Sequence, residues 1–170
     1  DWDLIAAEKL SNALLKEYPE SGDVHFLRAR IEFLKGNYDR SWIILQRVSN
    51  DFKEISDFKN QVNSTRQAAK KFVIHETEHF IIRHEEGADE VLLLYANEVL
   101  EKSYRVLGEI LEYYPQDKIL IEIYPERESF SKVSPLTMQD ILTSGTVALC
   151  KYNRIMMISP GSLVRGYNWM

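Results

Sequence analysis

The sequence predicts an α+β protein in which N-terminal α-helical hairpins precede a small mixed α/β sheet layer. Apolar residues recur at helical spacing through residues 1–70, whereas β-branched and aromatic residues alternate with polar ones from residue 72. A nearly continuous apolar run at residues 118–124 is typical of a central strand that is buried on both faces. We therefore expect a helical domain at residues 1–70 and an α/β domain at residues 71–170.

The composition narrows the classes of partner. The chain has 170 residues, 45% of them apolar, and a formal net charge of −5, which disfavours a nucleic-acid partner. No apolar run approaches the ~20 residues of a transmembrane helix, so we expect no membrane span. A single cysteine, Cys150, excludes an internal disulfide, and its apolar strand context predicts a buried structural thiol. Nothing in the sequence indicates a cellular compartment.

Four helices are expected in residues 1–70. The first ends at Tyr18-Pro19, because the residue before a proline disfavours helix. Ser21 is a plausible N-cap of the second helix, which closes at Gly36-Asn37. The third helix extends from Tyr38 to Val48, and a more polar fourth helix covers about residues 52–71.

These helices contain a partial internal sequence repeat with a period of 34 residues. Small residues at positions 7, 29 and 41 would let paired helices approach closely. Arg28 and Glu32 stand where large apolar residues are expected, and Lys53 stands where proline would recur. The matched features are Leu4 with Tyr38, Ala7 with Ser41, Leu14 with Val48, the turn Gly36-Asn37-Tyr38, and Pro19.

Residues 1 to about 50 therefore resemble tetratricopeptide (TPR) repeats, which stack on neighbouring repeats or domains. The resemblance implies a protein or peptide partner that is held in a concave groove. The alternative is a plain pair of helical hairpins.

The second half is expected to contain a strand, a long helix, a second strand, short helices and a hairpin. The first strand covers residues 72–84. Its large apolar residues stand at even positions and would share one face of the strand: Phe72, Ile74, Phe80 and Ile82. The long helix covers residues 86–114, and the apolar strand and two short helices at 125–130 and 136–143 follow. The closing hairpin pairs residues 147–149 with 155–157 through a turn at Tyr152-Asn153, where asparagine tolerates left-handed backbone.

One short motif resembles a zinc site. His75-Glu76-Thr77-Glu78-His79 fits H-E-x-x-H, in which a helix brings both histidines to one metal ion. Here the flanking apolar residues favour a strand, where residues four apart are separated by ~13 Å. A hairpin at residues 76–78 would bring the histidines closer, and His84 adds a third imidazole nearby. We interpret the histidines as polar residues on the solvent side of a strand.

Three glutamates are weaker candidates for a functional site than the histidine motif. Glu122, Glu126 and Glu128 lie close together around the end of a strand, where carboxylates can serve acid–base chemistry. We interpret them as a solvated rim. The sequence assigns no catalytic, cofactor-binding or metal-binding residue within residues 1–170.

Residues 72–170 resemble the first half of a peptidase MA-like domain, a gluzincin-type zinc metallopeptidase family that is often fused to TPR repeats. The matching stretches follow the family's order: residues 79–83, the long helix to Leu107-Gly108, residues 119–125, Phe130, residues 146–148 and 153–160, and the lead-in at 165–169, with Tyr167 and Trp169. In that family the zinc-binding helix comes just after this lead-in, so its ligands would lie beyond Met170.

The resemblance implies the N-terminal portion of a zinc metallopeptidase-like protein that is inactive as given and has no cofactor of its own. It further implies that residues 154–159 form a sheet edge that pairs with extended substrate, and that Met157→Pro abolishes peptide binding in a complete domain. The alternative function is a non-catalytic protein-interaction module that carries a degenerate peptidase-like domain. A third hypothesis is a zinc site at His75, His79 and His84. An exposed sheet edge also makes homo-oligomerisation plausible.

Overall fold

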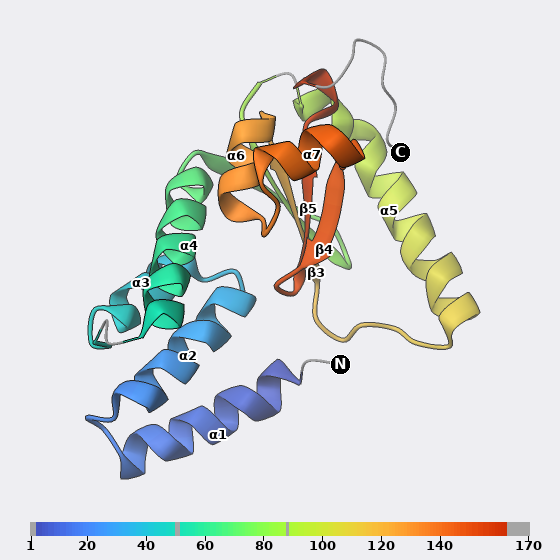
Figure 1. Cartoon of the computed structure of the whole chain (residues 1–170). Coiled ribbons are helices and arrows are strands. Elements are labelled where there is room, and N and C mark those ends of the chain that lie inside the picture. Colours follow the sequence, from blue (N-terminus) through green and yellow to red (C-terminus); the bar gives the residue numbers. More distant parts are fainter. Residues whose placement is uncertain (1–2, 50–51, 88, 163–170) are drawn as a thin grey trace. The chain divides into compact units, whose positions relative to one another are not determined.

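The computed structural model describes residues 3–49, 52–87 and 89–162, and the fold is α+β (Figure 1). The chain divides into two compact units, Asp1–Ala68 and Ala69–Met170. The first unit is helical, and the second contains the sheet with its helices.

The first unit contains α1 (Leu4–Glu17), α2 (Gly22–Leu34), α3 (Tyr38–Leu45) and α4 (Lys53–Ala69). Two of the boundaries have a clear local cause. The Ser21 hydroxyl accepts a hydrogen bond from the backbone N–H of Val24, which confirms the predicted N-cap. Gly36 has a φ of 77°, a left-handed conformation that closes the turn between α2 and α3.

Helix α2 is the central helix of this unit and packs against both α1 and α3. Ala29 on α2 and Ser41 on α3 are fully buried, and the Ser41 hydroxyl donates to the Ala29 carbonyl at 2.8 Å. The two small side chains therefore allow the close approach that the sequence predicts. Phe58 of α4 packs edge-on against Phe26 and Phe33 of α2, with ring centroids 5.5 and 5.4 Å apart.

A buried ion network occupies the two positions at which charged residues stand where the TPR pattern expects large apolar ones. The Arg28 guanidinium lies 2.8 Å from a Glu8 carboxylate oxygen and 2.7 Å from one of Glu32, whose side chain is fully buried. The Asn37 amide donates to the other oxygen of Glu32 at 2.9 Å. The charged pair is thus compensated inside the unit, as a buried pair must be.

In the second unit the described residues form a five-stranded sheet in the order β1-β2-β3-β5-β4. The strands are β1 (Phe72–Glu76), β2 (Phe80–Glu85), β3 (Ile119–Tyr124), β4 (Ala148–Lys151) and β5 (Arg154–Ile158). Strands β2, β3 and β5 run parallel, and β1 and β4 are antiparallel edge strands. Central strand β3 is buried on both faces, which confirms the prediction from its apolar run.

Helices cover both faces of this sheet (Figure 1). The long helix α5 (Glu90–Leu111) packs on one face, where Phe80, Ile82, Ala96, Ile121 and Ile123 form a buried cluster. The short helices α6 (Arg127–Val133) and α7 (Met138–Ser144) belong to the opposite face, where α6 contacts β3 and β5. A short 3-10 helix, Pro160–Ser162, follows β5.

The structure corrects the prediction of a single strand at residues 72–84. A hairpin turn divides this segment into β1 and β2, which pair Phe72 with Glu85 and Ile74 with Arg83. Paired residues of neighbouring strands share a face, so Phe72 and Ile74 lie on the opposite face from Phe80 and Ile82. Counting parity through the turn therefore placed these four residues on one face incorrectly.

The closing hairpin has its turn where the sequence predicts it. Tyr152 and Asn153 have φ values of 57° and 58°, and a two-residue hairpin turn of type I′ requires positive φ at both positions. The prediction that residues 154–159 form the sheet edge is wrong, because β5 pairs with β3 on one side and with β4 on the other. The edge at this end of the sheet is β4.

Two further findings concern the exposure of Cys150 and the predicted absence of a membrane span. Cys150 is exposed rather than buried, because it lies on edge strand β4. None of the helices in the described ranges combines the length and the apolarity that crossing a membrane requires.

Candidate functional site

The H-E-x-x-H segment lies in the β1–β2 hairpin. His75 and Glu76 belong to β1, and Thr77, Glu78 and His79 form the connection to β2. His75 pairs across the hairpin with Ile82. Since the segment is not helical, its two histidines do not share the helix face on which a zinc-peptidase motif depends.

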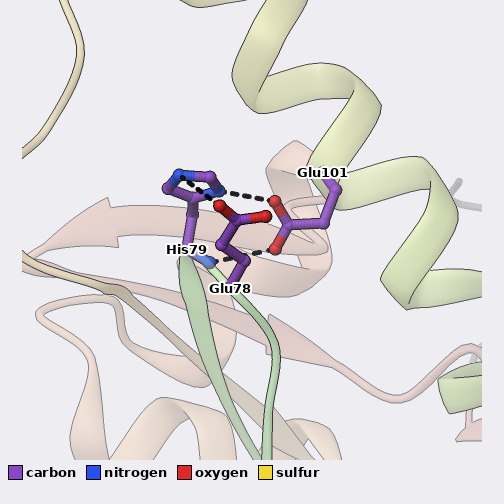
Figure 2. A group of neighbouring side chains, drawn as sticks. All are labelled: Glu78, His79 and Glu101. Carbon is purple, nitrogen blue, oxygen red and sulfur yellow. Dashed lines mark hydrogen bonds and ion pairs between the residues drawn. The ribbon is translucent and has the colours of Figure 1, made fainter.

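The connection is instead fastened to α5 by the carboxylate of Glu101 (Figure 2). One oxygen of Glu101 accepts hydrogen bonds from the Thr77 hydroxyl at 2.6 Å and from the backbone N–H of His79 at 3.0 Å. The other oxygen lies 2.6 Å from Nδ1 of His79. The Thr77 hydroxyl also accepts a hydrogen bond from the backbone N–H of Phe80 at 3.1 Å. Because Glu101 holds this hydroxyl, its carboxylate also orders the first residue of β2.

The imidazole of His79 is held by a second contact. Its ring stacks on the ring of Tyr104, with centroids 3.8 Å apart and an interplanar angle of 15°. The Tyr104 hydroxyl donates to the carbonyl of Pro115 at 2.9 Å. Both neighbours of the imidazole are therefore fixed by their own hydrogen bonds, and the ring has a defined orientation.

The hydrogen bonds that the Glu101 carboxylate accepts determine the direction in which its pKa shifts. Partial burial raises the pKa of this carboxyl, but the hydrogen bonds from His79, from Thr77 and from the backbone of His79 outweigh burial and lower the pKa to about 2. The carboxylate is therefore charged throughout the neutral and mildly acidic range.

Glu78, His79 and Glu101 form a group whose potential ligand atoms all lie within 4.8 Å of one another. Glu101 binds Nδ1 of His79, the position of an outer carboxylate that orients a metal-bound imidazole. Two ligands then remain: Nε2 of His79 and the carboxylate of Glu78, whose side chain is 80% exposed. A structural zinc site needs four protein ligands and a catalytic site three, so this group does not fit resident zinc.

His84 takes no part in this group. It is buried, with 1% exposure, and its Nδ1–H donates to the carbonyl of Glu85 at 2.8 Å. Its Nε2 is buried without a hydrogen-bond partner. Within the described ranges, His75, His79 and His84 do not form a common ligand group.

The structure also corrects the interpretation of Glu122 as part of a solvated rim. Its side chain is fully buried on the β3 face opposite α5, 3.3 Å from an Arg83 guanidinium nitrogen and 3.1 Å from Nε of Arg154. The Tyr124 hydroxyl donates to Glu122 at 2.6 Å. Glu126 is exposed, as is Glu128. The three glutamates separate because alternate residues of a strand face opposite sides and the chain leaves the sheet after Tyr124.

Sequence reasoning missed Glu101, Thr77 and Tyr104. Glu101 lies 22 residues from His79 on a helix whose sequence shows several similar exposed glutamates. No local pattern distinguishes it, because only the packing of α5 on the sheet brings it to the turn. The predicted lead-in at residues 165–169, with Tyr167 and Trp169, lies outside the described residues.

Comparison with known proteins yields no match: no family model fits the chain, and no curated protein or solved structure is significantly similar to it.

Proposed function

We propose that residues 71–170 are the N-terminal portion of a zinc metallopeptidase-like domain and that residues 1–70 are TPR-like helices attached to it. The observation that carries this proposal is that, within the part of the chain that the structure describes, α5 does not cover the whole of its sheet face. Ile155 and Met157 on that face are only partly buried, and Cys150 beside them is exposed.

Helix α5 has a matching apolar stripe. Tyr95, Val99, Val106 and Ile110 recur along one side of the helix and are 59%, 38%, 45% and 69% exposed. Residues at these intervals lie on one side of a helix, adjacent to the side that packs on the sheet. The stripe and the uncovered strands together fit a second apolar helix, and in the peptidase MA-like resemblance that helix is the zinc-binding one.

The proposal includes inactivity of residues 1–170 on their own. The residues described do not fit resident zinc, so no catalytic step is assigned to them. Their role in a complete domain is to supply the sheet and the supporting helix. Edge strand β4, rather than β5, is then the strand that pairs with an extended peptide.

The coding sequence beyond the codon for Met170 tests this proposal first. We expect an H-E-x-x-H motif within the next one or two helical turns. The full-length protein is then expected to contain stoichiometric zinc and to hydrolyse peptides, and to lose both when either motif histidine is replaced by alanine. A stop codon, or a continuation without metal ligands, would refute the enzyme proposal.

A non-catalytic interaction module is the second candidate function. Its support is a concavity of about 470 Å³ that is lined by side chains of α1, α2 and α3 and of the turns that follow α1 and α3. A concave surface between helices is where helical-repeat proteins hold their partners.

A further inference from the structure

The concavity in the first unit has an unusual charge for an acidic protein. Its wall contains Arg28, Arg40 and Arg47, together with Leu15, Ile43 and Ile44; we call it the basic concavity. The formal net charge of the chain is −5, so cationic side chains are concentrated here against the overall trend.

The three arginines differ in availability. Arg28 is buried and is bound by Glu8 and Glu32, so it serves the internal ion network. Arg40 lies 3.5 Å from Glu32, but its side chain is 65% exposed. Arg47 is exposed, and its guanidinium has no ion pair among the residues described.

The carboxylates near the basic concavity are already neutralised. Glu32 faces Arg28 and Arg40, and Glu8 faces Arg28 and Lys35, whose Nζ lies 2.7 Å from it. The hydrogen bonds from Lys35 and Arg28 lower the pKa of Glu8. Three cationic side chains, Arg28, Lys35 and Arg40, compensate these two carboxylates, and Arg47 adds a further positive charge to the wall, so positive charge remains for a ligand.

The spacing of the two available arginines defines the ligand. Arg40, Ile43 and Ile44 lie on α3, and Arg47 lies in the turn that follows it, where the backbone N–H of Arg47 still donates to the carbonyl of Ile44. Since this turn continues the helical path of α3, the seven residues from Arg40 to Arg47 rise by about 10 Å along it. In a polyproline II segment, residues three apart share one side and are separated by about 9 Å.

We propose that the basic concavity binds an extended acidic peptide segment with two carboxylates three residues apart. Arg40 and Arg47 bind one carboxylate each, because a guanidinium matches the fork of a carboxylate. An apolar side chain between the two acidic residues lies against Ile43, which is 65% exposed, and Ile44. This inference rests on the interaction role named above as the second candidate and is independent of the metallopeptidase proposal.

The probe is a fluorescein-labelled peptide containing Glu-Leu-Pro-Glu, and binding to residues 1–170 is followed by fluorescence anisotropy. A peptide with glutamine at both acidic positions tests charge, and one with adjacent glutamates tests spacing. We expect the Glu-Leu-Pro-Glu peptide to bind at least about tenfold more tightly than either control, a difference of about 1.4 kcal/mol.

Charge reversal at the two arginines locates the site. We expect Arg40→Glu and Arg47→Glu each to weaken binding about tenfold, and Arg47→Lys, which keeps the charge, to weaken it by less. Arg30→Glu is the matched control, because Arg30 lies outside the concavity and stacks on Phe26. Circular dichroism and thermal unfolding check that each variant is folded, and an unfolded variant is replaced by its glutamine equivalent.

Equal affinity for the three peptides, no binding by the unmodified chain, or unchanged binding by both charge reversals would overturn the inference. These results would leave the metallopeptidase proposal intact, because that proposal depends on the sequence after Met170 and on zinc content. Conversely, a stop codon after Met170 would leave this peptide test unaffected.

Discussion

Two glutamates illustrate how single residues stabilise this fold in different ways. Glu101 is partly buried and connects a helix to a turn through several hydrogen bonds. Glu122 is fully buried and compensates Arg83 and Arg154 inside the second unit. Both roles are structural rather than catalytic, and each has a measurable effect on the free energy of unfolding.

Glu101→Gln is expected to lower the free energy of unfolding by about 2 kcal/mol at pH 7, since an amide oxygen accepts hydrogen bonds less strongly than a carboxylate. The folded-state pKa of Glu101 is lowered from 4.5 to about 2. Its contribution is therefore fully present above about pH 4.5 and is lost as the pH falls through about 2.

Denaturant unfolding between pH 7 and pH 2 measures this effect. The difference between the unmodified chain and Glu101→Gln should shrink on acidification. Glu98→Gln, on the exposed side of the same helix, is the control and should change little. A difference that stays constant with pH would contradict the role given to the Glu101 carboxylate.

Glu122→Ala is expected to destabilise the chain by about 3–5 kcal/mol, because it leaves the buried Arg154 guanidinium and that of Arg83 without their carboxylate. Urea unfolding followed by circular dichroism measures this, with exposed Glu126→Ala as the control. Replacing the pair together, as Glu122→Leu with Arg154→Met, should recover much of the loss. A cost for Glu122→Ala no greater than that of the control would disprove burial of the charge.

At the scale of elements, local conformation and pairing determine the ends of the sheet. Both edge strands belong to antiparallel hairpins, and each hairpin reverses over a few residues. Helix α5 ends at a left-handed residue, Glu112, whose N–H donates to the carbonyl of Gly108. The β4–β5 hairpin provides the clearest test, because both of its turn residues have left-handed backbone.

Asn153→Val is expected to destabilise the second unit by about 1–2 kcal/mol, because a β-branched residue is strained at a φ of 58°. Asn153→Gly should be neutral or slightly stabilising at this position, since glycine accepts this conformation freely. Thermal unfolding of the two variants side by side gives the answer. Valine tolerated as well as glycine would exclude the left-handed turn.

At the scale of the whole molecule, exposed apolar surface is concentrated on α5. The stripe of Tyr95, Val99, Val106 and Ile110 lies in the same unit as the two edge strands of the sheet, β1 and β4. Surfaces of this kind promote association when nothing covers them. The isolated chain of 170 residues is therefore expected to self-associate at high concentration.

Val106→Lys should reduce this self-association without lowering stability, because the side chain is 45% exposed and lysine is a good helix former. Analytical ultracentrifugation over a range of concentrations measures the effect. Leu142→Lys, at a site 60% exposed on α7, is the matched control and should leave association unchanged. If both variants associate equally, the strand edges rather than the α5 stripe drive assembly.

The sequence by itself determined the α+β class, the helices of the first unit, the central strand and the turn at Tyr152-Asn153. These features depend on local causes: the spacing of apolar residues along one helix, the run of apolar residues in one strand, and the conformational preferences of a few turn residues. Such causes operate within a dozen residues and can be followed directly in the chain.

Only the tertiary structure decided which strands lie at the edges, which face Phe72 and Phe80 occupy, that Glu122 is buried, and that Glu101 meets His79. Each of these depends on pairing or packing between segments that are far apart in the sequence, such as the 39 residues between Arg83 and Glu122. A carboxylate looks the same in a sequence whether it is solvated or buried against a guanidinium. Its environment is set by the strands and helices that the completed fold brings around it.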